Sequence, residues 1–335
     1  MCYTSFTADG FTEGGRTNTL GDMKAQTGSN WVSLNIIEYQ STPSSTDIAP
    51  NTSGTNPLTG GPASLSSTED DIREGIREAR ALGMKVMLIP HVNLYTGAWR
   101  ADIVPDAGGA WFTSYSSMIL KYARLAQENG LEMLCVGTEY VRATQHTYTP
   151  EWRSLISAVR RVYSGELVYA ANWSGASEPG TSQPEYEQVE FWDALDAAGI
   201  DAYYPLTDSP GDSLPAFSDA VRRTLLSSSG ISLLSIRTQR PVIITEVGVQ
   251  STRGALAAPW NYLPGTSPGA REDTATQKFY YRVMIEALGE RPWCRGMFWW
   301  NWESVPSAAE STNYTPSHKP AAEVLKSWYS EGMRP

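Results

Sequence analysis

The chain has 335 residues, of which 41% are hydrophobic, and its formal net charge is −10 at pH 7. This acidic balance excludes a nucleic-acid partner, because no basic stripe is available to neutralise phosphates. No apolar stretch approaches the ~20 residues that a membrane-spanning helix needs, so we expect no membrane partner. The cysteines and histidines number three each and lack the spacing of metal ligands or of a disulfide framework. We therefore expect buried free cysteines, no metal and no cofactor.

Short apolar runs typical of buried parallel strands recur along the chain, and helix-like segments separate them. The expected strands are Tyr3–Phe6, Trp31–Ile37, Lys85–Pro90, Leu131–Gly137, Leu167–Ala171, Ile200–Tyr204, Pro241–Glu246 and Arg295–Trp300. Eight strands alternating with helices predict an α/β protein, a single (β/α)8 TIM barrel with residues 1–335 as one domain.

Helix boundaries and long loops support the same architecture. Thr68 is expected to cap a helix that Gly83 ends, and Thr149 to cap a second that Gly165 ends. Long loops follow three strands, where they would wall a cleft over the barrel mouth. These loops are Glu38–Leu65, Gln250–Arg271 and Trp302–Lys319.

Polar and aromatic residues cluster where the expected strands end, which is the face that carries the site in such barrels. Glu139 and Glu246 each close an apolar run, and two carboxyl groups on separate strands are what hydrolysis of a glycosidic bond requires. The accompanying side chains offer amides, hydroxyls and aromatic surfaces for a sugar. These candidates for substrate binding are His91, Asn93, Trp99, Asn172, Trp173, Tyr203, Tyr204, Trp300, Asn301 and Trp302.

Plainer interpretations exist for several of these residues. Glu139 alone could be a structural carboxylate paired with Arg142. Glu38 and Asp201 are expected to be solvated charges rather than parts of the site. Alternation along a strand allows only one of Tyr203 and Tyr204 to face inward. The 12 tryptophans and 17 tyrosines fit carbohydrate binding and an aromatic-rich core equally well.

The strand-end sequences resemble those of glycoside hydrolase family 113, endo-β-1,4-mannanases within the clan A retaining (β/α)8 glycosidases. The resemblance covers nearly the whole chain in barrel order. It lies in Ser29-Asn30-Trp31-Val32-Ser33-Leu34, Pro90-His91-Val92-Asn93, Val136-Gly137-Thr138-Glu139, Tyr169-Ala170-Ala171-Asn172-Trp173, Asp201-Ala202-Tyr203-Tyr204-Pro205, Ile244-Thr245-Glu246-Val247-Gly248 and Phe298-Trp299-Trp300-Asn301-Trp302.

This resemblance implies that Glu139 is the general acid/base and Glu246 the nucleophile of a retaining mechanism. It also implies a raised pKa for Glu139 and hydrogen-bond donors that keep Glu246 ionised. Most clan members carry Asn immediately before the acid/base to bind the sugar 2-hydroxyl, whereas this chain has Thr138. Either the Thr138 hydroxyl makes a reduced version of that contact, or Asn172, on the neighbouring strand, makes it instead.

We expect a β-linked polysaccharide or oligosaccharide as the substrate, most simply β-1,4-mannan, and a monomeric protein. The alternatives are another β-glycan, exo rather than endo attack, or a barrel that binds carbohydrate without catalysis. Because long polysaccharide is met outside the cell, we expect an extracellular location with a signal peptide removed. The cytoplasm is the alternative, since short oligosaccharides can be imported.

Overall fold

The computed structural model describes residues 1–12, 19–175, 183–267, 269–305 and 309–331. Its strands are β1 (Cys2–Thr4), β2 (Trp31–Gln40), β3 (Lys85–Leu94), β4 (Met133–Thr138), β5 (Glu166–Asn172), β6 (Ala197–Asp201), β7 (Val242–Val247), β8 (Cys294–Trp299) and β9 (Trp302–Glu303). Its α-helices are α1 (Leu20–Thr27), α2 (Glu69–Ala81), α3 (Ala110–Glu128), α4 (Thr149–Arg160), α5 (Glu185–Gln188), α6 (Phe217–Ser227), α7 (Ser229–Thr238), α8 (Leu263–Thr266), α9 (Thr274–Met284) and α10 (Pro320–Glu331).

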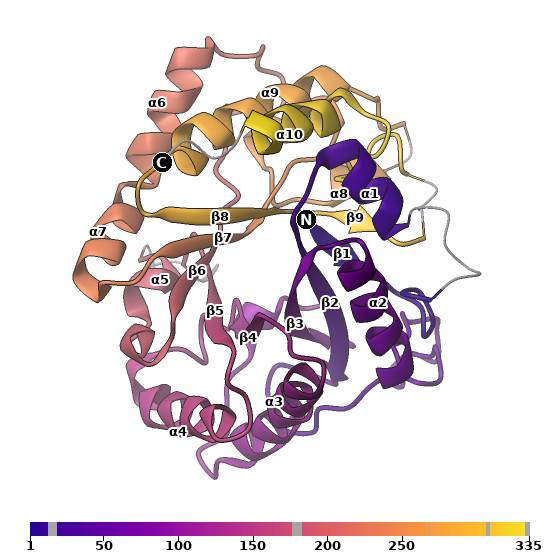
Figure 1. Cartoon of the computed structure of the whole chain (residues 1–335), viewed down its shortest axis with the longest axis vertical. Helices are drawn as coiled ribbons and strands as arrows, with labels where there is room; N and C mark the ends of the chain where they lie inside the picture. Colours follow the sequence, from indigo (N-terminus) through magenta and orange to yellow (C-terminus); the bar gives the residue numbers. More distant parts are fainter. Residues whose placement is uncertain (13–18, 176–182, 268, 306–308, 332–335) are drawn as a thin grey trace.

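The strands of the described residues form one parallel sheet in the order β8-β7-β6-β5-β4-β3-β2-β1-β9. Only Trp300 and Asn301, joined by a cis peptide bond, separate β8 from β9 in the chain. Because β8 pairs with β7 and β9 pairs with β1, the two together act as the eighth strand and close the ring. Helices surround this ring (Figure 1). The predicted (β/α)8 barrel is thereby confirmed.

The core has two layers, as the alternation of side chains along each strand requires. The inner layer fills the barrel with residues such as Met87, Cys135 and Phe298. The larger outer layer lies between strands and helices and is rich in aromatic rings, among them the fully buried Trp111 and Trp152. Many of the chain's aromatic residues therefore serve packing.

The element boundaries differ from the sequence-based ones in understandable places. β6 ends at Asp201, so Tyr203 and Tyr204 follow the strand instead of ending it. Thr68 caps α2 as predicted, its hydroxyl accepting from the Asp71 backbone N–H at 3.2 Å. Thr149 does not cap α4, because it is already the first helical residue.

Glu38 is not a solvated loop charge, and that expectation is wrong. It lies within β2 and is 2% exposed. Its carboxylate accepts a hydrogen bond from the Tyr122 hydroxyl at 2.7 Å and forms an ion pair with Lys121, both on α3. The residue fastens α3 to β2, which is a structural role.

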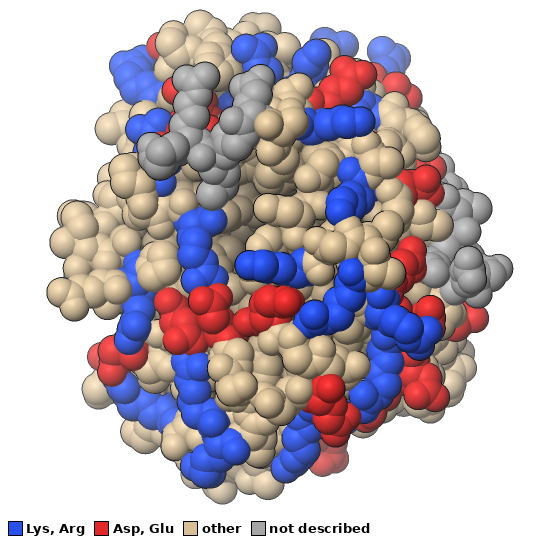
Figure 2. Space-filling view, in the orientation of Figure 1, with Lys and Arg blue, Asp and Glu red and all other residues tan. Residues whose placement is uncertain are grey.

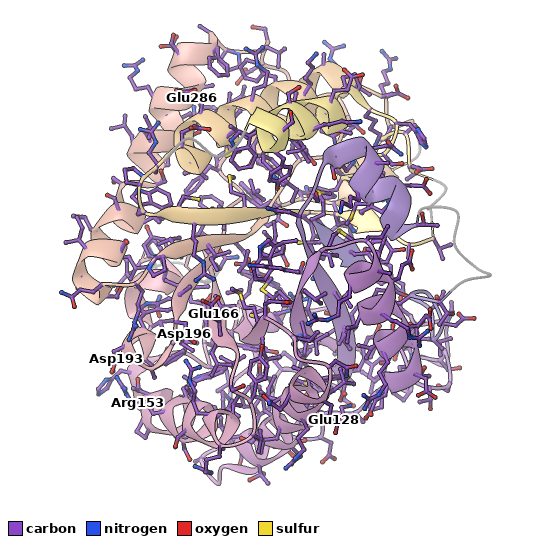
Figure 3. All side chains as sticks on the ribbon, viewed as in Figure 1. Glu128, Arg153, Glu166, Asp193, Asp196 and Glu286 are labelled. Atoms are coloured by element: carbon purple, nitrogen blue, oxygen red, sulfur yellow. The ribbon has the colours of Figure 1, made fainter. Side chains whose placement is uncertain are left out.

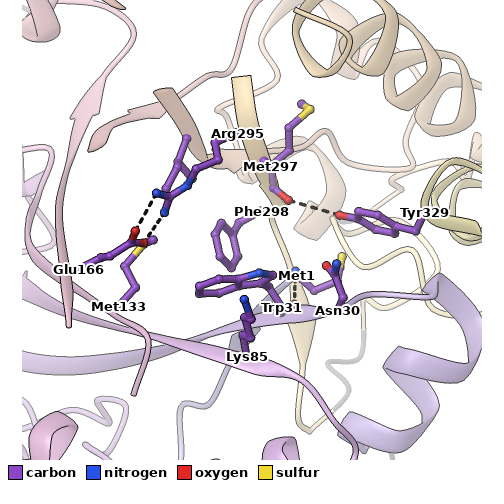
Figure 4. Close-up of a pocket in the computed structure, with 12 residues that line it drawn as sticks. Met1, Asn30, Trp31, Lys85, Met133, Glu166, Arg295, Met297, Phe298 and Tyr329 are labelled. Carbon is purple, nitrogen blue, oxygen red and sulfur yellow. Dashed lines mark hydrogen bonds and ion pairs between the residues drawn. The ribbon is translucent and has the colours of Figure 1, made fainter. Parts of the chain in front are cut away.

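A pocket of about 380 Å³ lies at the end of the barrel where the strands begin. Trp31 and Phe298 meet edge to face there at 6.3 Å, and Arg295 forms a two-point ion pair with Glu166 (Figure 4).

Figure 2 shows basic and acidic side chains side by side on the face in view. Glu166, Asp196, Asp193 and Arg153 lie on the same side of the molecule in Figure 3, and Arg153 pairs with Asp193 at 2.7 Å. Groups at the strand starts of such barrels serve stability, so we assign no chemistry to the end of the barrel where the strands begin.

Within the described part of the chain, no helix is both long and apolar enough to cross a membrane. Cys2, Cys135 and Cys294 are free and buried, as predicted.

Candidate active site

Glu139 follows β4 directly and has a backbone conformation that few residues other than glycine adopt. Its φ is 55°, in the left-handed region. Its N–H still donates to the Ala170 carbonyl on β5 at 2.8 Å, so the residue turns away from the strand while tied to the sheet. Such conformations persist only where surrounding contacts hold them, and they concentrate at functional sites.

Three side chains hold the Glu139 carboxyl group. Asn172, the last residue of β5, donates from Nδ2 to Oε1 at 2.5 Å. Trp99 donates from its indole N–H to Oε2 at 3.0 Å, and Arg100 Nη1 lies 3.7 Å from the same oxygen. These contacts fix the orientation of the carboxyl group. A structural pairing of Glu139 with Arg142 does not appear among these contacts.

Arg100 is a functional residue that the sequence pattern did not predict. It lies in a short 3-10 turn after β3, and because it belongs to no expected strand end, the strand-end pattern does not include it. Asn93, a predicted sugar contact, uses its side-chain oxygen to accept from Arg100 Nη2 at 2.8 Å. Asn93 therefore positions Arg100 against Glu139.

Glu246 lies near the end of β7 and is 5% exposed. The Tyr203 hydroxyl donates to its Oε2 at 2.7 Å. Its other oxygen, Oε1, has no hydrogen-bond partner among the described residues. Tyr203 is thus the inward-facing member of the tyrosine pair, and Glu246 keeps one oxygen free.

His91 and Trp300 lie beside Glu246. His91 Nε2 is 3.8 Å from Glu246 Oε1 and 3.5 Å from Asn35 Nδ2. The imidazole stacks on the Trp300 ring, with centroids 6.3 Å apart. Burial, and secondarily the charge of Arg100, hold the pKa of His91 well below its usual range. The ring is therefore neutral and adds a polar surface rather than a positive charge.

The pKa of Glu246 is raised above the ordinary glutamate value. Burial is the main cause and the charge of Glu139 the second, while the Tyr203 hydrogen bond and Arg100 oppose the rise. The expected donor to Glu246 is present, since the Tyr203 hydroxyl donates to it, but this hydrogen bond does not offset burial and the charge of Glu139. The two carboxyl groups are close enough to disfavour two negative charges at once.

Asp201 is a third carboxyl group in this region, contrary to the expectation of a solvated charge. It ends β6 with no exposed surface, and the Thr245 hydroxyl donates to its Oδ1 at 2.6 Å. Burial, followed by the charges of Glu246 and Glu139, raises the pKa of Asp201 well above its usual range. Asp201 therefore favours the protonated form beside Glu246, with which it is paired in register between β6 and β7.

Aromatic rings extend from the glutamates toward the loop that follows β7. Trp173 packs edge-on against Tyr204 with centroids 5.0 Å apart, and tilts against Trp260 at 5.5 Å. Tyr204 is 1% exposed and Trp260 is 49% exposed. Tyr204 thus packs against Trp173 and is closed to solvent, which contradicts its prediction as a sugar contact. Trp260, which the strand-end pattern could not single out, presents the open surface.

The segment from Trp299 to Trp302 only partly meets its prediction. Trp302 has no exposed surface, so its prediction as a sugar contact is wrong. Asn301 donates from Nδ2 to the Thr4 hydroxyl at 2.9 Å and bridges the closing strands. Trp299 stacks on Tyr281 in the outer core. Of these four residues, only Trp300 lies near the glutamates, where it stacks on His91.

No group of three or more His, Cys, Asp or Glu side chains in the described ranges is arranged to hold a metal ion. Two buried carboxyl groups lie at strand ends of the barrel, each with at least one hydrogen-bond donor, and aromatic rings border them. A pair of carboxyl groups placed in this way is what hydrolysis of a glycosidic bond requires. The site therefore places the chain in the class of barrel-fold glycoside hydrolases.

Comparison with known proteins gives the family. Residues 1–319 match the sequence profile of Glycoside Hydrolase Family 113, and the chain belongs to this family. A search of curated protein sequences found no match.

Solved structures agree. Two solved structures described as GH113 β-1,4-mannanase, one of them as a complex, are each 27% identical, with TM-scores of 0.79 for the complex and 0.78 for the other; each alignment covers 98% of this chain and 97% of the other. A GH113 β-mannanase from Alicyclobacillus acidocaldarius, in complex with ManMIm, is 28% identical with a TM-score of 0.77, over 99% of this chain and 96% of that one. A β-glucuronidase from Ruminococcus gnavus shares only the fold, at 12% identity, a TM-score of 0.59, and 97% and 48% coverage.

Proposed function

We propose that this glycoside hydrolase is an endo-β-1,4-mannanase that cleaves with retention, with Glu139 as acid/base and Glu246 as nucleophile. Mannan is supported by the solved relatives, described as β-1,4-mannanases and aligned over nearly the whole chain. The observation that carries the catalytic assignment is the pair of buried strand-end carboxyl groups, coupled in charge and held by different donors.

The first step needs an ionised Glu246 and a protonated Glu139. Glu246 attacks the anomeric carbon while Glu139 gives its proton to the departing glycosidic oxygen. Glu246 thus loses its charge to an ester bond as Glu139 gains one. The pair carries a single negative charge before and after the step, which suits a site that resists two.

The environment of Glu139 fits its part in this exchange. The charge that forms on Glu139 meets the Trp99 and Asn172 donors and the Arg100 guanidinium. These groups favour the product of proton donation. In the second step Glu139 takes a proton from water, which attacks the anomeric carbon and releases Glu246.

The substrate is tested by measuring reducing ends released from β-1,4-mannan, glucomannan, cellulose, xylan and galactan, with Glu246→Ala as the blank. We expect release from mannan and glucomannan by the wild type only. Release from xylan or galactan alone would keep the chemistry and overturn the substrate. No release from any polymer would favour the binding-only alternative.

The roles are tested with two variants. Glu246→Ala should lose turnover, and azide should restore part of it by taking the place of the carboxylate. Glu139→Ala should lose far more kcat/KM on substrates with poor leaving groups than on dinitrophenyl glycosides, which need no acid. Undiminished activity of Glu246→Ala, or equal losses of Glu139→Ala on both substrate types, would overturn the assignment.

A further inference from the structure

A fourth carboxyl group, Glu185, lies behind Glu139 and takes no part in the chemistry above. It is the first residue of the short helix α5 and has no exposed surface. No salt bridge joins it to a cation anywhere in the described ranges. The Tyr169 hydroxyl donates to its Oε1 at 2.5 Å, the Asn172 backbone N–H donates to its Oε2 at 2.6 Å, and Thr144 Oγ1 lies 3.1 Å from Oε1.

These contacts reach Glu139 by two routes. Tyr169, besides meeting Glu185, accepts from the backbone N–H of Tyr140 at 2.9 Å, and Tyr140 directly follows Glu139. Asn172 is held at its backbone by Glu185, while its side chain donates to the Glu139 carboxyl group. Glu185 therefore fixes both the chain beyond Glu139 and the amide that orients its carboxyl group.

We propose that Glu185 is a positioning residue for the acid/base Glu139, holding it through Tyr169 and Asn172. The inference rests on the proposed function of Glu139. Its physical basis is the left-handed backbone of Glu139, which neighbouring contacts must maintain. A buried side chain that accepts from Asn172 and Tyr169 at once ties β5 to the turn after β4. Loss of that link moves the proton donor rather than the nucleophile.

The charge state of Glu185 selects the conservative variant. Burial raises the pKa of Glu185 to about 8, and the charge of Glu139 adds to the rise, while the bonds from Asn172, Tyr169 and Thr144 oppose it. Neutral Gln is therefore a close match near neutral pH. Its carbonyl can accept from the Asn172 N–H, and its amide can donate to the Tyr169 oxygen. Leu has the same bulk and neither bond.

The test measures kcat/KM on two aryl mannosides, one with a poor and one with an activated leaving group. Displacement of a catalytic group by about 1 Å costs ~100-fold. We expect Glu185→Leu to lose on the order of 100-fold on the poor leaving group and only a few-fold on the activated one. Glu185→Gln should stay within a few-fold of wild type on both. Azide should raise kcat of Glu185→Leu and yield a β-mannosyl azide, because azide needs no general base.

Two further variants keep the test decisive. Tyr169→Phe keeps the ring and removes the hydroxyl, so it should give a smaller loss of the same kind if Glu185→Leu does not fold. Glu38→Leu removes another buried carboxyl group with a tyrosine donor, and should not change the ratio between the two substrates. Equal losses on both substrates in Glu185→Leu, or none, would overturn the inference. If Glu139→Ala itself shows no dependence on the leaving group, the proposed function fails instead.

Discussion

The hydrogen bond from Tyr203 to Glu246 gives the most quantitative prediction. The hydroxyl donates to Oε2 at 2.7 Å and is the only donor to this carboxyl group among the described residues. A hydrogen bond to a charged group contributes ~1.5–3 kcal/mol. Since one pKa unit corresponds to ~1.36 kcal/mol, removing it in Tyr203→Phe should raise the pKa of Glu246 by ~1–2 units.

The sign follows from which form of Glu246 the bond favours. Tyr203 stabilises the carboxylate, so its loss favours the protonated acid, and attack needs the carboxylate. The acidic limb of kcat/KM lies above the ordinary glutamate value of 4.5 in the wild type, because the pKa of Glu246 is raised. In Tyr203→Phe this limb should move further toward alkaline pH by the same ~1–2 units.

The assay is the pH profile of kcat/KM on a dinitrophenyl mannoside, which removes the need for acid assistance by Glu139. Tyr204→Phe is the matched control, because the Tyr204 hydroxyl is buried without a described partner and the ring packs edge-on against Trp173. The control profile should match the wild type. An acidic limb that stays in place in Tyr203→Phe, or moves toward acid, would refute the account of Glu246.

Three further predictions concern binding and stability. Trp260→Ala should raise KM on mannan ~5-fold, from the ~1 kcal/mol of an exposed aromatic contact, with little change on a short aryl mannoside; equal KM on mannan would remove Trp260 from the binding surface. Asp201→Asn should stabilise the protein increasingly as pH rises from 3.8. The reason is that the pKa of Asp201 is raised in the folded state, so the wild type loses ~1.36 kcal/mol of folding free energy per pH unit between the unfolded-state and folded-state pKa values. A melting-temperature gain independent of pH would contradict this. Glu38→Ala should lower the free energy of unfolding by ~2 kcal/mol, discounted because Lys121 is 35% exposed, while kcat/KM on mannan stays the same; lost activity at unchanged stability would contradict its structural role.

The barrel and its two glutamates could be predicted from the sequence because they follow from local patterns. Buried parallel strands give apolar runs, and a carboxylate that ends such a run stands at the functional face. Alternation also limited the tyrosine pair to one inward member. The pattern could not choose between Tyr203 and Tyr204, because β6 ends at Asp201 before either residue.

The contacts around the glutamates depend on tertiary structure that no local pattern encodes. Arg100 reaches Glu139 from a turn after β3, and Glu185 from a four-residue helix between β5 and β6. Charged residues near strand ends are usually solvated, and this general rule predicts an exposed position for Glu38 and Asp201. Both are buried instead, because other elements supply partners for their carboxyl groups. Lys121, Tyr122 and Thr245 supply these partners from other elements.

The most direct test of the catalytic assignment is to trap the glycosyl-enzyme. The 2-fluorine of a 2-deoxy-2-fluoro-mannosyl fluoride slows both steps, whereas the anomeric fluoride is a good leaving group and lets the first step proceed. Hydrolysis of the glycosyl-enzyme is then the slow step, so that the sugar stays attached to the nucleophile. Peptide mass spectrometry of the inactivated protein should place one sugar on Glu246, and Glu246→Ala should take up none. A label on Glu139, or full turnover of mannan with inversion at the anomeric carbon, would contradict the account.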